Sequence, residues 1–151
     1  KPLDSPTPGG PNECPAAPTT PQLVAVLAYS HVWKYDATAT DLGVLWREID
    51  YDDSGWRSGP GLLGFETNPL PAPLLTSFPN AANPTYYFRT PFEANAGVVA
   101  STLQVTHLVD DGAAFYLNGR EIARYNLASG AGYRNFAAAN LGDATPQTFA
   151  K

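Results

Sequence analysis

Charged residues are scarce in this 151-residue chain, and positive charge is the scarcer sign. Only 15% of the residues are charged, and nine Lys and Arg residues stand against fourteen Asp and Glu residues, which leaves a net charge of −5. A surface that follows a phosphate backbone needs clustered Lys and Arg side chains, whereas these nine are scattered along the chain. We therefore expect no nucleic acid among its partners.

Long apolar runs and cysteine are also nearly absent. No stretch approaches the roughly 20 consecutive apolar residues of a membrane helix, and the first residues do not form a charged-then-apolar signal peptide. We expect no membrane insertion. The single cysteine, Cys14, excludes an internal disulfide framework and a zinc site built on paired thiolates. Cys14 is either a surface thiol without a role or a link between chains in an oxidising compartment.

Catalytic motifs are missing as well. His31 and His107 are the only histidines, and without a spaced third ligand they are typical of hydrogen-bonded structural histidines. No Gly-x-Ser-x-Gly elbow is present. Adjacent aspartates such as Asp110 and Asp111 are a poor template for the separate acid and base of a glycoside hydrolase. We therefore expect that the chain is not an enzyme.

Proline, glycine and tyrosine are plentiful, with 15, 13 and 8 residues. Seven of the prolines fall in residues 1–22, where they forbid a helix and favour an extended, polyproline-like arm or linker. From Leu23 onward the pattern changes to short apolar or alternating runs separated by turn residues, which is typical of strands. The chain thus divides into an arm, 1–22, and a β domain, 23–151.

Most of the predicted elements of the domain are strands. Asn118-Gly119 is the strongest hairpin signal, because a two-residue type I′ turn needs positive φ twice. Asp41 can cap one helical turn that ends at Trp46, and Tyr51 to Trp56 has turn chemistry. Residues 57–83 are expected to form a long irregular connection of the kind that is often functional. Strands are predicted at 23–28, 31–35, 85–89 (resuming at Phe92), 102–109, 113–117 and 121–125, with weaker ones near 133–136 and 147–149.

A series of aromatic and acidic motifs recurs along the domain. It runs through Trp33-Lys34-Tyr35, Trp46, Tyr51-Asp52-Asp53-Ser54-Gly55-Trp56, Leu63-Gly64-Phe65, Tyr86-Tyr87-Phe88-Arg89 with Phe92, and Asp110-Asp111-Gly112 onward to Asn126. In this order the motifs resemble the galactose-binding-like jelly-roll modules of large secreted bacterial proteins, and the Asp-Asp-Gly hairpin is the most specific part. The resemblance implies an all-β, antiparallel β-sandwich, a secreted or cell-surface location and a non-catalytic role.

The chain departs from this family in two places. His107 stands where the family usually has an apolar residue, and two further strands usually follow the position of Gln147-Thr148-Phe149. A sandwich without its last strands exposes sheet edges. Either the chain is a fragment whose domain is incomplete at the C-terminus, or a strand from another molecule fills the gap, for which Leu23 to Tyr29 is a better donor than the arm.

Two acidic pairs are candidate cation sites. Asp110 and Asp111 offer the hard oxygen ligands that Ca²⁺ prefers, provided that the backbone kinks at Gly112. The structural alternative is that they cap a turn and pair with Arg89 or Arg120. The pair Asp52-Asp53 is open to the same two interpretations. In yeast flocculin-type lectins an analogous Asp-Asp pair holds calcium and sugar together.

Aromatic residues are candidate ligand contacts. The three tryptophans either fill the core or form a platform for sugar rings, and tyrosines expected at the surface, such as Tyr87, Tyr125 and Tyr133, are equally suitable. The predicted binding residues are Trp33, Tyr87, Arg89 and Tyr125.

The sequence leads to three hypotheses about function. The favoured one is a non-catalytic extracellular module that binds a polysaccharide, glycan or cell surface, with Ca²⁺ as its one candidate cofactor. The second is a structural subunit of an extracellular filament or surface layer, whose partners are other copies of itself joined by strand donation. The third, a hydrolase fragment, has no catalytic residues to support it.

Overall fold

The computed structural model describes residues 23–79, 83–93, 102–142 and 144–151. The Pro-rich arm and Cys14 therefore lie outside the described residues. The described part is all-β: it has strands and a single 3₁₀ turn, and it has no α-helix. No helix within it is long and apolar enough to cross a membrane.

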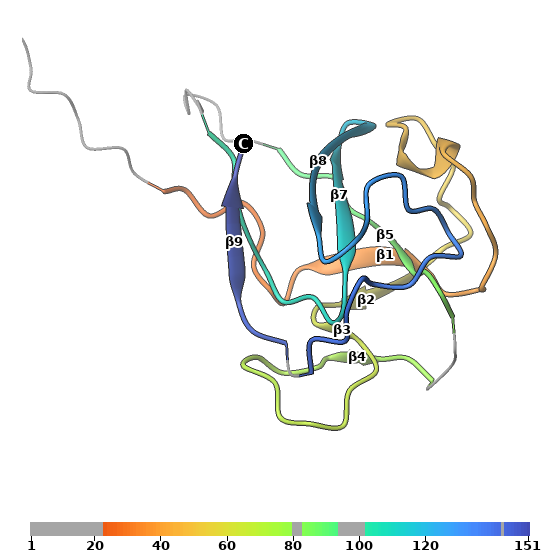
Figure 1. Cartoon of the computed structure of the whole chain (residues 1–151). Helices are drawn as coiled ribbons and strands as arrows, with labels where there is room; N and C mark the ends of the chain where they lie inside the picture. The colour runs from red at the N-terminus through yellow and green to blue at the C-terminus, as the bar shows by residue number, and fades with distance from the viewer. Residues whose placement is uncertain (1–22, 80–82, 94–101, 143) are drawn as a thin grey trace, which may run out of the picture.

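A three-stranded antiparallel sheet lies in the middle of the molecule (Figure 1). Its central strand is β1 (Val32–Asp36), flanked by β2 (Arg57–Pro60) and β5 (Tyr87–Arg89). In the register of β1 and β2, Trp33 lies opposite Gly59. A Cβ at Gly59 would collide with the side chain of Thr76, so this close approach requires glycine.

A short parallel pair follows, formed by β3 (Leu63–Gly64) and β4 (Thr76–Ser77). The hydroxyl of Thr76 donates a hydrogen bond to the carbonyl of Pro60 at 2.8 Å, which connects this pair to β2. The prediction of one long irregular connection over 57–83 was therefore wrong. Gly and Pro dominate this segment, but they allow very short strands to form between the turns.

Two antiparallel pairs complete the fold. The first joins β6 (Gln104–His107) to β9 (Gln147–Ala150), and the second is the hairpin of β7 (Ala113–Leu117) and β8 (Arg120–Tyr125). Asn118 and Gly119 have φ angles of 47° and 80°. The predicted type I′ turn, the strand over 102–109 and the weak strand near 147–149 are confirmed.

Several other predicted elements differ from the structure. Residues 23–28 form no strand, and Leu23 is 81% exposed. Residues 133–136 form no strand, since Tyr133 and Arg134 lie in a turn, and the chain around Phe92 is not a strand either. The helical turn exists as 3₁₀ helix η1 (Leu45–Arg47), but Val44 is its N-cap, because the Asp41 carboxylate accepts the Gly43 N–H at 2.9 Å instead. An apolar run specifies a strand only where another backbone pairs with it.

Aromatic rings make up most of the core. Phe78 is 6% exposed and packs on Tyr35 and Tyr86 at 4.9 and 5.1 Å between ring centroids. A second cluster surrounds His107, which is 8% exposed and lies within 5 Å of the rings of Phe115 and Tyr125. No large side chain among the described residues is fully buried. The core is therefore thin, and its rings contact one another in both stacked and tilted arrangements.

The hairpin turn gives a first testable prediction. The variant Gly119→Ala places a side chain at φ 80°, so it should lower the free energy of unfolding by about 1 kcal/mol because L-residues are strained there. Urea unfolding measures the change. The matched control is Gly55→Ala, since a Cβ at Gly55 meets nothing within 4 Å. Equal effects of the two substitutions would contradict the turn assignment.

Candidate functional site

The two acidic pairs lie in opposite electrostatic environments. Asp53 accepts hydrogen bonds from Lys34 Nζ at 2.5 Å and from Arg89 Nε at 2.9 Å. These contacts lower the pKa of Asp53 below its ordinary value. The hydrogen bond from Lys34 is the largest cause, and Arg89 contributes further. Asp52 accepts the Ser54 N–H at 3.0 Å, as a turn-capping aspartate does. Both residues are thus engaged in structural contacts, as the structural alternative for this pair predicts.

Arg89 is an internal side chain, 16% exposed. Besides Asp53, its guanidinium donates to the carbonyls of Trp46 and Glu48, the latter at 2.8 Å, and lies 5.3 Å from the ring of Tyr51. It therefore joins β5 to the segment that follows η1. The structural alternative for Asp110-Asp111 named Arg89 or Arg120 as the partner, and Arg89 is paired with Asp53 instead.

Asp110 and Asp111 open the β6–β7 connection, and a third carboxyl group, that of Glu66, joins them. The carboxyl group of Asp110 interacts with those of both Asp111 and Glu66. Partial desolvation, followed by the interactions with Asp111 and then those with Glu66, raises the pKa of Asp110 to about 7. When Asp110 holds a proton, it can donate that proton in a hydrogen bond to a neighbouring carboxylate, and in this sense the proton is shared.

The neighbours of the pair have fixed structural partners. Asp111 Oδ1 accepts the Leu141 N–H at 2.9 Å, and Asn126 Nδ2 donates to the Asp111 carbonyl at 3.1 Å. A Cβ at Gly112 would lie 2.9 Å from the Asn126 carbonyl oxygen, so the Asp-Asp-Gly motif needs glycine for this close approach. Asp111 and Gly112 thus position the connection, while the carboxyl group of Asp110 faces Glu66.

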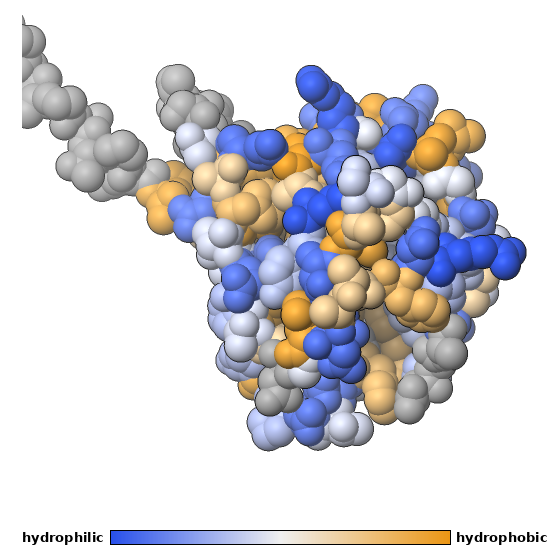
Figure 2. Space-filling view, viewed as in Figure 1, coloured by the Kyte–Doolittle hydropathy of each residue, from blue (hydrophilic) through white to orange (hydrophobic). Residues whose placement is uncertain are grey.

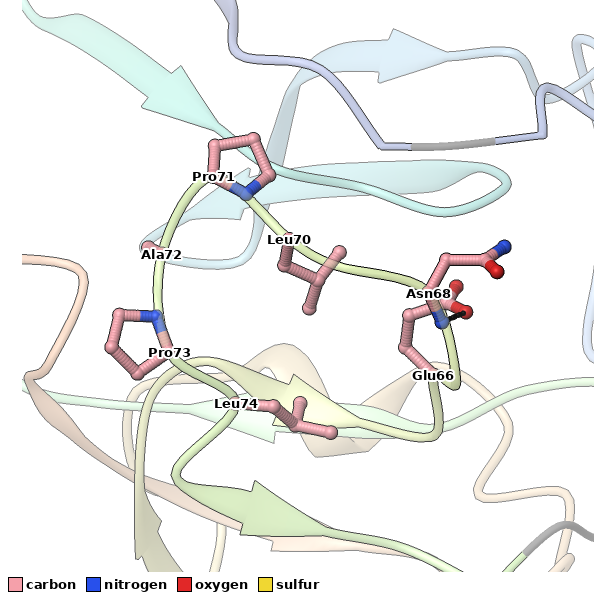
Figure 3. A pocket seen from close by; sticks show the side chains of 7 residues that line it. All are labelled: Glu66, Asn68, Leu70, Pro71, Ala72, Pro73 and Leu74. Carbon is pink, nitrogen blue, oxygen red and sulfur yellow. Dashed lines mark hydrogen bonds between the residues drawn. The ribbon is translucent and has the colours of Figure 1, made fainter.

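Glu66 also lies at the rim of a pocket. The pocket has a volume of about 330 Å³ and is formed by the β3–β4 loop (Figure 3). The residues that line it are Glu66, Asn68, Leu70, Pro71, Ala72, Pro73 and Leu74. Two backbone N–H groups, those of Thr67 and Asn68, donate to Glu66 Oε1 at 2.6 and 2.7 Å, and they lower the pKa of Glu66. Glu66 therefore stays ionised and leaves the shared proton to Asp110.

Five of the seven residues that line the pocket have apolar side chains. Figure 3 shows the side chains of Leu70 and Leu74 inside the loop, with Pro71, Ala72 and Pro73 forming the turn between these two leucines. The base of the loop is closed by hydrogen bonds of Leu62, whose N–H donates to the Pro73 carbonyl at 3.4 Å and whose carbonyl accepts the Leu75 N–H at 3.0 Å. Alternating prolines restrict φ and thereby stiffen the loop.

The four predicted ligand contacts do not gather in one place. Tyr87 is 5% exposed, so the expectation that it lies at the surface was wrong: its ring packs on Trp46 at 4.9 Å and its hydroxyl accepts the Leu42 N–H. Burial raises the pKa of Tyr87. Trp33 stands edge-on to His31, and Tyr125 to His107. Within the described ranges no hydrogen bond, ion pair or ring contact joins any two of the four.

The calcium site expected at Asp110 and Asp111 stays a prediction. In the described part of the chain, no group of three or more His, Cys, Asp or Glu side chains lies in an arrangement that would hold a metal ion. The sequence did not predict a role for Glu66 or its loop, because only the fold brings Glu66 to Asp110. The alternating prolines of the loop were the one signal in the sequence that pointed to it.

No known protein family, no curated protein and no solved structure matches this chain. The resemblance to galactose-binding-like modules therefore stays a prediction.

The titration of Asp110 gives a second prediction. Its folded-state pKa of about 7 lies above the unfolded value of about 3.9. Folding therefore favours the protonated form, and the resulting stability is lost as the pH rises from about 4 through 7. The variant Asp110→Asn cannot ionise, so it should stabilise the protein at pH 8 relative to pH 4.5, by about 1 kcal/mol after solvent screening.

Urea unfolding at the two pH values measures this difference. The control is Asp50→Asn, which removes the same charge from an exposed aspartate. An Asp110→Asn variant whose effect is the same at both pH values would show that Asp110 does not titrate abnormally.

The Asp53 contacts give a third prediction. Arg89→Met leaves two backbone carbonyls without their donor and removes one cation from Asp53, so it should lower the free energy of unfolding by about 2–3 kcal/mol. Lys34 is 40% exposed, and Lys34→Met should cost less than about 1 kcal/mol. Thermal and urea unfolding compare the two. A larger cost at Lys34 would show that Arg89 is not the main partner.

Proposed function

We propose that the chain is a non-catalytic, extracellular or cell-surface module that binds a saccharide at the pocket of the β3–β4 loop. The observation that carries this proposal is that the apolar side chains of Leu70 and Leu74 line the same pocket as the carboxyl group of Glu66. Asp110 does not line the pocket, but its carboxyl group interacts with that of Glu66. Sugars combine apolar C–H faces with hydroxyl groups that donate to carboxylates. Ligand pockets are mostly apolar with few polar groups, and a volume of 330 Å³ lies at the small end of their range of about 300–1,000 Å³.

The protonation state of the rim suits hydroxyl recognition. Ionised Glu66 accepts hydrogen bonds, whereas Asp110, with a pKa raised to about 7 by partial desolvation and its carboxyl neighbours, can both donate and accept near neutral pH. A saccharide hydroxyl can both donate and accept as well. Such a rim adapts to different hydroxyl orientations, which is useful on a polysaccharide with many similar sugar units.

The same geometry favours binding without catalysis. In glycoside hydrolases the two carboxyl groups flank the scissile bond at about 5 Å or more. Asp110 instead directly precedes Asp111 in the chain and interacts with the carboxyl group of Glu66, so these groups are a poor template for an acid and a base on opposite sides of a glycosidic bond. The secreted, galactose-binding-like jelly-roll assignment is part of this proposal and is supported by the all-β fold and the Asp-Asp-Gly hairpin.

A glycan array followed by calorimetry tests the proposal. We expect saturable binding of at least one polysaccharide, weakened about tenfold by Leu70→Ala and by Glu66→Gln, a loss of about 1.4 kcal/mol each. The matched control for the charge is Glu93→Gln, which is exposed and does not line the pocket. Absence of binding to any polysaccharide, or binding that neither pocket variant weakens, would overturn the proposal.

Repeating the binding measurement with a chelator distinguishes a site that works without a metal ion from a site that needs Ca²⁺. We expect binding to be unchanged by removal of divalent cations, because the Glu66 carboxylate and the apolar side chains of the loop contact the saccharide without a metal ion in this proposal. Loss of binding on chelation, restored by Ca²⁺, would establish the calcium site predicted at Asp110 and Asp111.

A further inference from the structure

Residues 23–28 form an apolar segment that is not paired as a strand. Leu23, Val24 and Val26 are 81%, 46% and 42% exposed, and the segment carries no charge. Figure 2 shows this hydrophobic surface where the chain from residue 23 joins the body. Among the described residues its one backbone hydrogen bond is at its end, where the Ala28 carbonyl accepts the His31 N–H at 3.0 Å. The segment is strand-prone in composition and lacks a backbone partner.

The outer edge of β9 has the complementary property. Leu103 and Lys151 exchange two backbone hydrogen bonds, of 2.6 and 2.9 Å. Bonded and non-bonded pairs alternate in an antiparallel ladder, so Phe149 bonds to β6, whereas the N–H and C=O groups of Thr148 and Ala150 point away from it. The hydroxyl contact between Thr106 and Thr148 at 2.9 Å fits such a close, non-bonded pair.

Among the described residues no strand pairs with this edge, and the one charged side chain beside it is that of Lys151, which follows β9. The β6–β9 sheet has two strands within the described ranges, and β9 lies at the margin of the molecule in Figure 1. Its residues, Gln147–Ala150, contain no charged side chain to block another strand. The aromatic cluster on the inner face, where Phe149 lies 5.2 Å from Phe115, is only half-buried. A further apolar strand at this edge would extend the cover of that cluster.

We propose that residues 23–28 of one copy of this chain add as a strand to the free edge of β9 in a second copy. The occupant is a second copy because each chain carries both halves of the contact: an exposed apolar segment without a strand partner and an edge with outward N–H groups. Donor and acceptor are different surfaces, so the contact either closes reciprocally in a dimer or continues from copy to copy. This interaction is independent of the saccharide pocket.

Two variants separate the halves. Val26→Lys places a charge in the donor and leaves β9 intact. Thr148→Pro removes one outward N–H from the acceptor and leaves the donor intact; proline is tolerated where an edge strand's N–H faces outward. Each should weaken self-association about tenfold or more in sedimentation velocity. Circular dichroism and thermal unfolding check that both variants are folded, and Ala150→Pro, at the other outward N–H, replaces Thr148→Pro if that variant unfolds.

The decisive measurement mixes the two variants. The Val26→Lys chain keeps a working acceptor and the Thr148→Pro chain keeps a working donor, so the mixture should form a heterodimer that grows no further. A wild-type protein that stays monomeric over the micromolar range, variants that associate as the wild type does, or a mixture that stays monomeric would each overturn the proposal.

Discussion

The ion pairs of Asp53 are the constraint on which the central sheet depends. One carboxylate, supplied by the turn before β2, holds Lys34 of β1 and Arg89 of β5. Arg89 in turn donates to the backbone after η1. Two strands of the sheet, the turn before the third strand and the backbone at the end of η1 therefore share a single network of charge-assisted hydrogen bonds. In a protein with few charged residues and no fully buried large side chain among those described, such a network supplies specificity that a thin core does not.

The same dipeptide serves opposite purposes at two places in the chain. At Asp52-Asp53 two cations lower the pKa of Asp53 and the pair stabilises the fold. At Asp110-Asp111 the nearby group is a third carboxyl, and desolvation together with these acidic neighbours raises the pKa of Asp110 to about 7. Perturbed pKa values of this kind are commonly found at functional sites, although structural networks of charged groups also produce them. Here it coincides with an apolar pocket, and this coincidence distinguishes the second pair from the first.

The sequence alone was enough for features that depend on neighbouring residues. The Asn118-Gly119 turn, the alternation along β6 and the capping by Asp52 follow from local backbone chemistry, and the structure has all three. Features that depend on distant partners were out of reach. Leu23–Ala28 has the composition of a strand, yet no described backbone pairs with it, and Tyr87 is buried because Trp46 and Tyr133 cover it. Glu66 has no local motif, and only the fold brings it to Asp110.

The central claim is that a saccharide occupies the β3–β4 loop, in contact with the carboxyl rim. NMR chemical-shift mapping during titration with a polysaccharide fragment tests it most directly. We expect the methyl groups of Leu70 and Leu74 and the carboxyl group of Asp110 to shift together along one saturable curve, because they line or adjoin one pocket. Shifts confined to Trp33 or Tyr125, or no shifts at any fragment concentration, would contradict this account.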